Sequence, residues 1–391
     1  MSGIVILLVV AGTVSAIVGV VAKQGKRTRA TWQSNAAELG LSFRPGPRSG
    51  RPIHARHHLP QMYGHYDGQD VYVGVRSYTT GSGQSRKTHY YTFIDVLFNV
   101  PLKRGLGVRP ANGVSKFFGS IFGQNDIQIG DPSFDKKFRI DGLDQRQVTS
   151  LLGHDTLRRA LDTTYPFGFL PSLNDDRVRL EAKGVIVQAN KLKPQIQGAV
   201  ALYREVVAAW DQQPPSNEEL QITPGWQQVA ERKQLSFEPR AMLMVGRLNE
   251  SSIRCEVVLN KNQFSTEMEA RFEPPLGGGL SIKKQGALSS VKKIFGAQDI
   301  IVGDEVFDRR YLIKGKDVER VKAILIPEAR VGLSQLDDLS HQLLVTDDIL
   351  RLTFNQVYGD GPAIERVLEM ITLTTKAMTQ FARPTTHGPF R

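Results

Sequence analysis

A long stretch of this chain occurs twice, and that limits the folds open to it. The segment IFGQNDIQIGDPSFDKKFRIDG, residues 121–142, matches IFGAQDIIVGDEVFDRRYLIKG, residues 294–315, without a gap. Eleven of the 22 positions are identical, whereas about one or two identities are expected from ordinary composition. The chain therefore contains two copies of one structural unit.

The similarity extends to both sides of this segment. Trp32 to Phe43 matches Trp226 to Phe237, and Asp175-Asp176 matches Asp347-Asp348. Between the copies, DQQPPSNEELQITPG is rich in proline and polar residues, which is typical of a linker. We predict five parts: a transmembrane anchor with a basic juxtamembrane segment over 1–30, a first repeat over 31–210, a linker over 211–225, a second repeat over 226–381 and a tail over 382–391.

Each copy shows the same order of expected elements. A short helix starts at the tryptophan, several strands follow, and then come a helix (about 144–161 and 317–338), a hairpin and a long C-terminal helix. Strands grouped together with helices after them indicate an α+β fold with a mostly antiparallel sheet. One apolar stripe runs along each terminal helix, which predicts that each helix packs on its own sheet. The stripes are Ile196, Val200, Tyr203, Val207 and Trp210, and Ile364, Leu368, Ile371, Thr375 and Met378.

The N-terminal segment differs from the rest of the chain. Residues 4–22 are 19 residues without a charge, long enough for a helix to span a bilayer. The basic residues Lys23, Lys26, Arg27 and Arg29 follow it and none precedes it. By the positive-inside rule, this asymmetry predicts a single-pass cell-membrane protein with its N-terminus outside and the remainder cytoplasmic.

A cleaved signal peptide is the alternative for this segment. Val14-Ser15-Ala16 resembles a cleavage site, but the basic region that should come first is missing. The single cysteine, Cys255, fits a reducing compartment. Of the formal net charge of +11, residues 23–60 contribute +7 (eight Lys or Arg and one Glu), which suits anionic lipid headgroups. We therefore expect a membrane partner through residues 4–22 and no nucleic-acid partner.

The repeated segment contains acids, but the residues around it do not complete a catalytic set. Asp131 and Asp135 recur as Asp304 and Asp308, with no His, Cys or third acid at a consistent offset. Gly130-Asp131-Pro132-Ser133 is typical of a turn in which the aspartate caps a short helix. The glycine run 277–279 lacks phosphate-loop spacing and predicts a hairpin turn. We identify no catalytic residue and no cofactor, which favours a protein that is not an enzyme.

Three histidines lie close together in HARHH. His54, His57 and His58 could in principle bind zinc. No cysteine is near, and the surrounding segment is rich in Arg, Pro and Gly. Solvated loop histidines are therefore the favoured interpretation, and the metal site remains the alternative.

A comparison of the two copies locates a candidate surface. In residues 90–99, Tyr90, Thr92, Ile94, Val96 and Phe98 match largely apolar residues in 264–273, which predicts a core face. The other face has Tyr91, Phe93 and Leu97 where the second copy has Ser265, Glu267 and Arg271. Apolar side chains on a sheet face are either covered by another part of the protein or used to bind a partner or ligand. The early part of the first copy is 20 residues longer than its counterpart, and this insertion or the other copy could cover them. Otherwise they form a contact surface.

Three hypotheses for function follow. The first is a non-enzymatic interaction or scaffold protein with Tyr91, Phe93 and Leu97 as its contact surface. The second is a binder of a hydrophobic small molecule or lipid, which requires an enclosed apolar pocket. The third is an enzyme with a site of scattered residues, which requires buried acids or histidines that converge.

Overall fold

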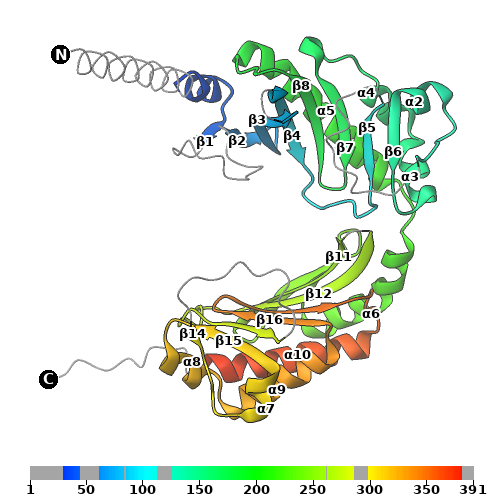
Figure 1. Cartoon of the computed structure of the whole chain (residues 1–391). Helices are drawn as coiled ribbons and strands as arrows, with labels where there is room; N and C mark the ends of the chain where they lie inside the picture. The colour runs from blue at the N-terminus through cyan, green and yellow to red at the C-terminus, as the bar shows by residue number, and fades with distance from the viewer. Residues whose placement is uncertain are drawn as a thin grey trace, which may run out of the picture. The chain divides into compact units, whose positions relative to one another are not determined.

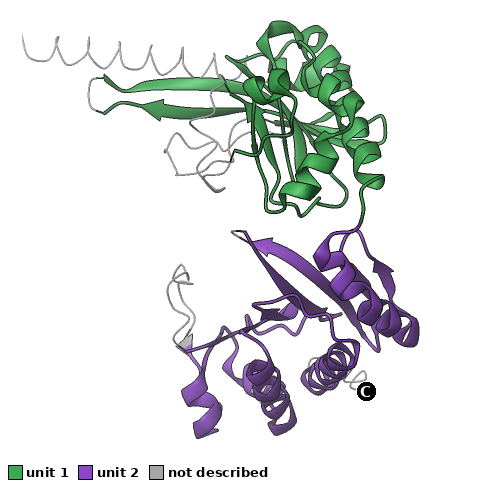
Figure 2. Cartoon of the chain, turned by 90° about the vertical axis from the view of Figure 1, so that its right-hand side faces the viewer, with its two compact units in different colours: residues 1–214 green, residues 215–391 purple. Residues whose placement is uncertain are grey.

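The structure, a computed structural model, describes residues 30–44, 61–82, 85–111, 126–260, 262–285 and 298–380. The chain divides into two compact units, residues 1–214 (unit 1) and residues 215–391 (unit 2) (Figure 1, Figure 2). Each unit is an α+β module with one antiparallel sheet, in agreement with this part of the predicted fold class.

In unit 1 the described strands form an eight-stranded sheet in the order β1-β2-β3-β4-β8-β7-β5-β6. The central strands are long because alternating apolar residues bury one face of each. The strands are β1 Ser42–Arg44, β2 Gln61–Tyr66, β3 Gln69–Thr80, β4 Lys87–Leu97, β5 Gly107–Pro110, β6 Phe138–Asp141, β7 Leu170–Asn174 and β8 Arg177–Lys183.

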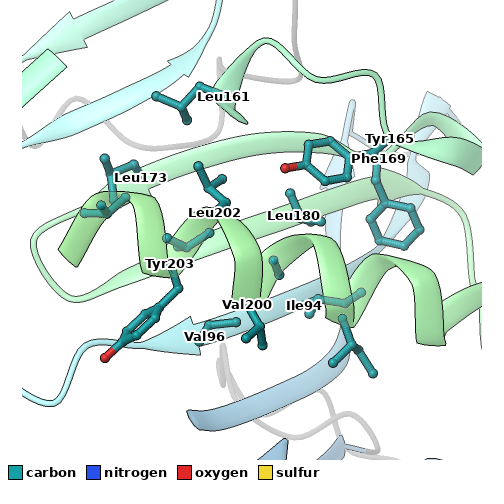
Figure 3. Close-up of a cluster of buried hydrophobic side chains, with 14 of the residues drawn as sticks. Ile94, Val96, Leu161, Tyr165, Phe169, Leu173, Leu180, Val200, Leu202 and Tyr203 are labelled. Atoms are coloured by element: carbon teal, nitrogen blue, oxygen red, sulfur yellow. The ribbon is translucent and has the colours of Figure 1, made fainter. Parts of the chain in front are cut away.

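The long helix α5 (Ala189–Asp211) packs on one face of this sheet, against β4 and β8. Its predicted apolar stripe is buried except for the half-buried Val207, and side chains of the helix and of the strands fill the layer between them (Figure 3). The labelled core residues are Ile94, Val96, Leu161, Tyr165, Phe169, Leu173, Leu180, Val200, Leu202 and Tyr203. The predicted helix over 144–161 is two short helices, α3 (Gln145–Leu152) and α4 (Asp155–Leu161), after α2 (Pro132–Lys137) and before the 3-10 turn η3 (Pro166–Gly168).

Unit 2 repeats this topology. Its described strands have the order β9-β10-β11-β12-β17-β16-β13-β15, followed by the short edge strand β14. They are β9 Ser236–Glu238, β10 Leu243–Leu248, β11 Ser251–Asn260, β12 Gln263–Arg271, β13 Ser281–Lys284, β14 Gln298–Asp299, β15 Tyr311–Gly315, β16 Gln342–Thr346 and β17 Ile349–Phe354. The helices are α6 Asn217–Lys233, α7 Glu305–Arg310, α8 Val318–Ile324, α9 Pro327–Leu339 and α10 Gly361–Thr379, and the predicted stripe on α10 is buried.

The helix expected to start at Trp226 begins earlier, within the predicted linker over 211–225. α6 starts at Asn217, where the Ser216 hydroxyl accepts a hydrogen bond from the Glu219 amide at 3.2 Å. Trp226 is fully buried, so tertiary packing outweighs the helix-breaking tendency of the Pro-Gly pair at 224–225. A Cβ atom at Gly225 would lie 2.1 Å from the carbonyl oxygen of Gly359, so glycine permits this close approach.

A buried threonine has the same role in both units. The Thr92 hydroxyl donates to the Gly184 carbonyl at 2.9 Å and accepts from the Ile186 amide at 2.8 Å. The corresponding Thr266 hydroxyl donates to the Gln356 carbonyl at 3.0 Å and accepts from the Tyr358 amide at 2.9 Å. Each threonine therefore ties the central strand to the connection that leads into the long helix.

The prediction of a membrane-spanning element is corrected. Among the described residues, no helix is long and apolar enough to cross a membrane, because the long helices are amphipathic and carry charged side chains on one face. Residues 4–22 and the basic residues Lys23, Lys26, Arg27 and Arg29 lie outside the described part of the chain. The predicted fold class is therefore corrected to two α+β units without a transmembrane helix. The predicted single-pass membrane localisation with a cytoplasmic remainder depended on that helix and is withdrawn.

Candidate interaction surface

The three predicted surface residues lie on the face of the unit 1 sheet opposite α5. We call this face, built by β3, β4 and β8, the open face. Its side chains are Tyr72, Gly74, Arg76 and Tyr78 on β3, Tyr91, Phe93, Asp95 and Leu97 on β4, and Arg177, Arg179 and Glu181 on β8. Strand alternation places them together because every second residue points to the same side.

Tyr91 is buried by its neighbours, with 3% of its surface exposed. Its ring stacks on Tyr78 at 5.4 Å between centroids, and the two hydroxyls are 3.0 Å apart. Tyr78 also stacks on His89 at 4.9 Å. Burial, together with the hydrogen bond to Tyr78, raises the pKa of Tyr91 to about 12. Tyr91 therefore packs against its neighbours within the open face and offers little surface to a partner.

Phe93 lies flat across the neighbouring strand. It is paired with Gly74 on β3, and a Cβ atom at Gly74 would come within 2.6 Å of the Phe93 Cζ atom. The Arg179 guanidinium lies over the same ring, 4.8 Å from its centroid. Gly74 leaves room for this half-buried ring, and Arg179 lies over it. Cation–π attraction between the Arg179 guanidinium and the ring stabilises the arrangement.

Arginine–carboxylate pairs hold the charged side chains of the open face in place. Arg179 donates to both oxygens of Asp95, at 2.6 Å to Oδ1 and 2.7 Å to Oδ2. Arg177 donates to Asp95 Oδ2 at 2.9 Å, and Arg76 forms a bidentate pair with Glu181. Burial acts to lower the pKa of Arg179, but hydrogen bonding to Asp95 and its charge outweigh burial and raise it. These arginines remain charged and are fixed in a planar, bidentate geometry.

The row of residues through Phe93 ends in an exposed leucine. Glu181 is paired with Phe93 on one side and with Leu170 of β7 on the other, and Leu170 is 44% exposed. Leu97 is half-buried at the end of β4, where it is paired with Arg177. The open face thus presents Phe93, Leu97 and Leu170 between fixed arginines.

Unit 2 shares the ion pair of this face but not its apolar residues. Arg351 donates to Glu269 at 2.6 Å, at the positions of Arg179 and Asp95. The positions of Gly74 and Phe93 are occupied by Glu256 and Glu267, which are paired with each other across β11 and β12. The ion pair is therefore a feature of the module, and the Gly74–Phe93 pair is specific to unit 1. The comparison of copies found Phe93, but no pattern in the sequence indicated Gly74 or Arg179.

One residue of the predicted core face departs from the prediction. Tyr90 is 46% exposed, whereas Thr92, Ile94, Val96 and Phe98 are buried as expected. Tyr90 lies where the β3–β4 hairpin extends past the end of β8, since β8 pairs with β4 only as far as Lys183 and Tyr91. The alternation is correct there, but within the described part of the chain no neighbouring strand or helix continues that far to cover it.

The repeated aspartates have structural roles. Asp131 caps α2 by accepting from the Ser133 and Phe134 amides, both at 3.1 Å. Asp135 accepts from the Ile129 and Gly130 amides at 3.0 and 3.2 Å. Asp304 and Asp308 repeat this arrangement in unit 2. The interpretation of Asp131 as a cap is confirmed, with Asp304 as its counterpart, whereas Asp135 and Asp308 lie inside the short helices and hold the preceding loop.

The predicted metal ligands are not placed. His54, His57 and His58 lie outside the described residues. Within the described part of the chain, His, Cys, Asp and Glu side chains form no group of three that could hold a metal ion. His65 lies on the surface, with its Nδ1 atom 2.7 Å from Asp70.

Comparisons with known proteins do not assign a family. No family model matches the chain, and no curated protein matches it. A crystal structure of the mycobacterial trehalose monomycolate transport factor A is similar in part, with 5% sequence identity and a TM-score of 0.31. The match covers 42% of this chain and 97% of that one. Similarity at this level is too low to support an inference about function.

Proposed function

We propose that unit 1 is a protein-binding module and that the chain acts as a non-enzymatic interaction or scaffold protein. The contact surface is the open face around Phe93, Leu97 and Leu170. The observation that carries this proposal is the Gly74–Phe93 pair beneath Arg179, which unit 2 replaces with two glutamates. A face whose only role is to close the fold would not need an aromatic ring at this position, since unit 2 folds in the same way without one.

The composition of the open face suits a protein partner. Aromatic residues and arginines are enriched at protein–protein interfaces and dominate their binding energy. Here the arginines are held by Asp95 and Glu181, so they lose little side-chain entropy when a partner binds. A partner would bury Phe93 and the two leucines and use the arginines at the rim.

The alternative of an enclosed hydrophobic ligand receives less support. It requires a cavity between the sheet and α5, but side chains such as Ile94, Leu180 and Val200 occupy that layer and are buried against one another (Figure 3). An apolar ligand there would have to displace part of the core, at a cost of about 2–5 kcal/mol for each large side chain that loses its contacts.

The test uses a photo-reactive amino acid at Leu97 in the full chain, with the same amino acid at Glu267 of unit 2 as the control. A protein that crosslinks only from position 97 is then purified, and its affinity is measured. The proposal expects Phe93→Glu, which copies unit 2, to weaken binding at least about tenfold, and Glu267→Ala to leave it unchanged. Equal affinity of the wild type and Phe93→Glu would overturn the proposal.

A further inference from the structure

One end of unit 1 exposes three large apolar side chains on adjacent segments. Tyr90 is 46% exposed, Phe167 is 52% exposed and Val185 is 51% exposed. The Tyr90 carbonyl accepts a hydrogen bond from the Gly184 amide at 2.8 Å, which places Tyr90 opposite the residue that precedes Val185. The turn η3, which contains Phe167, contacts β8 just before β7 starts at Leu170. We call this region, together with Lys183, Lys191 and Lys193, the basic end of unit 1.

Phe167 is held outward by the loop that contains it. It has a φ of 61°, in the left-handed region, and it lies between Tyr165 and Phe169, which are both buried. A bulky residue in this conformation costs about 1–2 kcal/mol. In unit 2 the corresponding helix α9 continues to Leu339 and β16 starts at Gln342, so the loop is specific to unit 1. The strained loop buries two aromatic rings and presents the third.

One lysine contacts these apolar side chains and two more are close in the sequence, whereas acids are missing from the neighbouring segments. The Lys191 ammonium lies over the Phe167 ring, 5.5 Å from its centroid, and Lys183 and Lys193 are exposed nearby in the chain. Residues 71–94, 163–174 and 182–204 contain no Asp or Glu. Glu181, the nearest acid on β8, is engaged by Arg76. The corresponding end of unit 2 has Asp360, Glu365 and Glu369. Charge complementarity therefore specifies an anionic partner.

The apolar side chains distinguish between anionic partners. Lysines alone would be enough to bind an acidic peptide or a nucleic acid. Binding to either of these partners does not explain why a phenylalanine, a tyrosine and a valine are exposed in the same region. A bilayer with anionic headgroups matches both features, since aromatic and aliphatic side chains enter the boundary below the headgroups while lysines remain at their level. We infer that the basic end of unit 1 docks on an anionic lipid surface. This docking is peripheral and uses the end of the sheet, where Lys183 is paired with Tyr91 at the margin of the open face.

The experiment uses the full chain with an environment-sensitive dye on Phe167→Cys. The native Cys255 is buried and does not compete for the label. The control carries the dye on Leu373→Cys, an exposed position in α10 of unit 2. Vesicles of phosphatidylcholine with phosphatidylglycerol should blue-shift the dye at 167, and brominated lipids should quench it. Vesicles of phosphatidylcholine alone should do neither.

A charge-reversal variant tests the contribution of the lysines. Lys183→Glu, Lys191→Glu and Lys193→Glu together should raise the lipid concentration needed for the shift at least about 100-fold. The matched control reverses Lys322, Arg366 and Lys376, which are exposed in unit 2, and should have little effect. The inference is overturned if the dye at 167 stays in water, if the dye at 373 shifts equally, or if heparin or an acidic protein gives the same shift without quenching by brominated lipid.

Discussion

Gly74 and Phe93 face each other across β3 and β4, and the ring of Phe93 occupies the space that a side chain at position 74 would need. The two residues depend on each other, because the glycine lets the ring lie flat and the flat ring lets Arg179 lie over it. This pair distinguishes the face of unit 1 from that of unit 2.

The dependence can be measured with a double-mutant cycle. Gly74→Ala alone should reduce the free energy of unfolding by about 1 kcal/mol, because the ring has to move. In a Phe93→Ala background the same change should stabilise unit 1 by a few tenths of a kcal/mol, since alanine restricts the unfolded chain more than glycine does. Urea unfolding of the four proteins gives the coupling energy. Equal effects of Gly74→Ala in both backgrounds would show that the residues are independent.

The buried threonines provide a test of the duplication. Thr92→Val and Thr266→Val each remove a hydroxyl that donates one hydrogen bond and accepts another. Each change should cost about 1–2 kcal/mol, because a partly buried carbonyl and a partly buried amide lose their partner. Hydrogen exchange of amides in each unit separates the two effects. We expect Thr92→Val to lower protection in unit 1, Thr266→Val to lower it in unit 2, and the two losses to agree within about 0.5 kcal/mol.

Asp175 gives unit 1 a pH dependence. It accepts hydrogen bonds from the amides of Arg104, Gly105 and Leu106 at 2.9, 2.7 and 3.2 Å. Burial outweighs these donors and raises its pKa from 3.8 to about 6. The folded state therefore binds a proton more tightly than the unfolded state, so this group's contribution to stability decreases as pH rises from about 4 to about 6.

Asp175→Asn should remove this dependence while keeping an acceptor oxygen. Between pH 4 and pH 7 the wild type should lose about 3 kcal/mol of stability relative to the variant, from a shift of about two pKa units. Chemical denaturation at several pH values measures the difference. A constant difference between the two proteins across this range would contradict the assignment.

Cys255 should report the unfolding of unit 2. It is fully buried on β11, and burial raises the pKa of its thiol to about 12, so the reactive thiolate is scarce in the folded state. A thiol reagent at pH 8 should react with the native protein at least about a thousandfold more slowly than with the unfolded protein. Rapid labelling of the native chain would indicate that β11 opens locally.

Much of the fold can be predicted from the sequence because apolar residues recur at the period of a helix or of a strand wherever one face is buried. The stripe of Ile196, Val200 and Tyr203 predicts the buried face of α5, and the duplication confirms the element order by repeating it. The alternation in residues 90–99 also shows which face of β4 is buried. Such patterns are local, so a single strand or helix is enough to reveal them.

Features that depend on partners distant in the sequence could not be predicted in this way. Alternation placed Phe93 on the open face but did not show that Gly74 and Arg179, from two other strands, hold its ring. The exposure of Tyr90 depends on where β8 ends. The early start of α6 depends on the close approach of Gly225 to Gly359, which makes the Pro-Gly pair acceptable within a helix.

The ion pair that both units share has a consequence for valency. Arg351 and Glu269 repeat Arg179 and Asp95, but unit 2 has Glu256 and Glu267 in place of the Gly74–Phe93 pair, and Arg271 in place of Leu97. The described residues therefore contain the open face once, so under the proposed function a partner with two binding sites would gain no avidity from the duplication. If the proposed function holds, divergence of the two faces makes a duplicated chain monovalent.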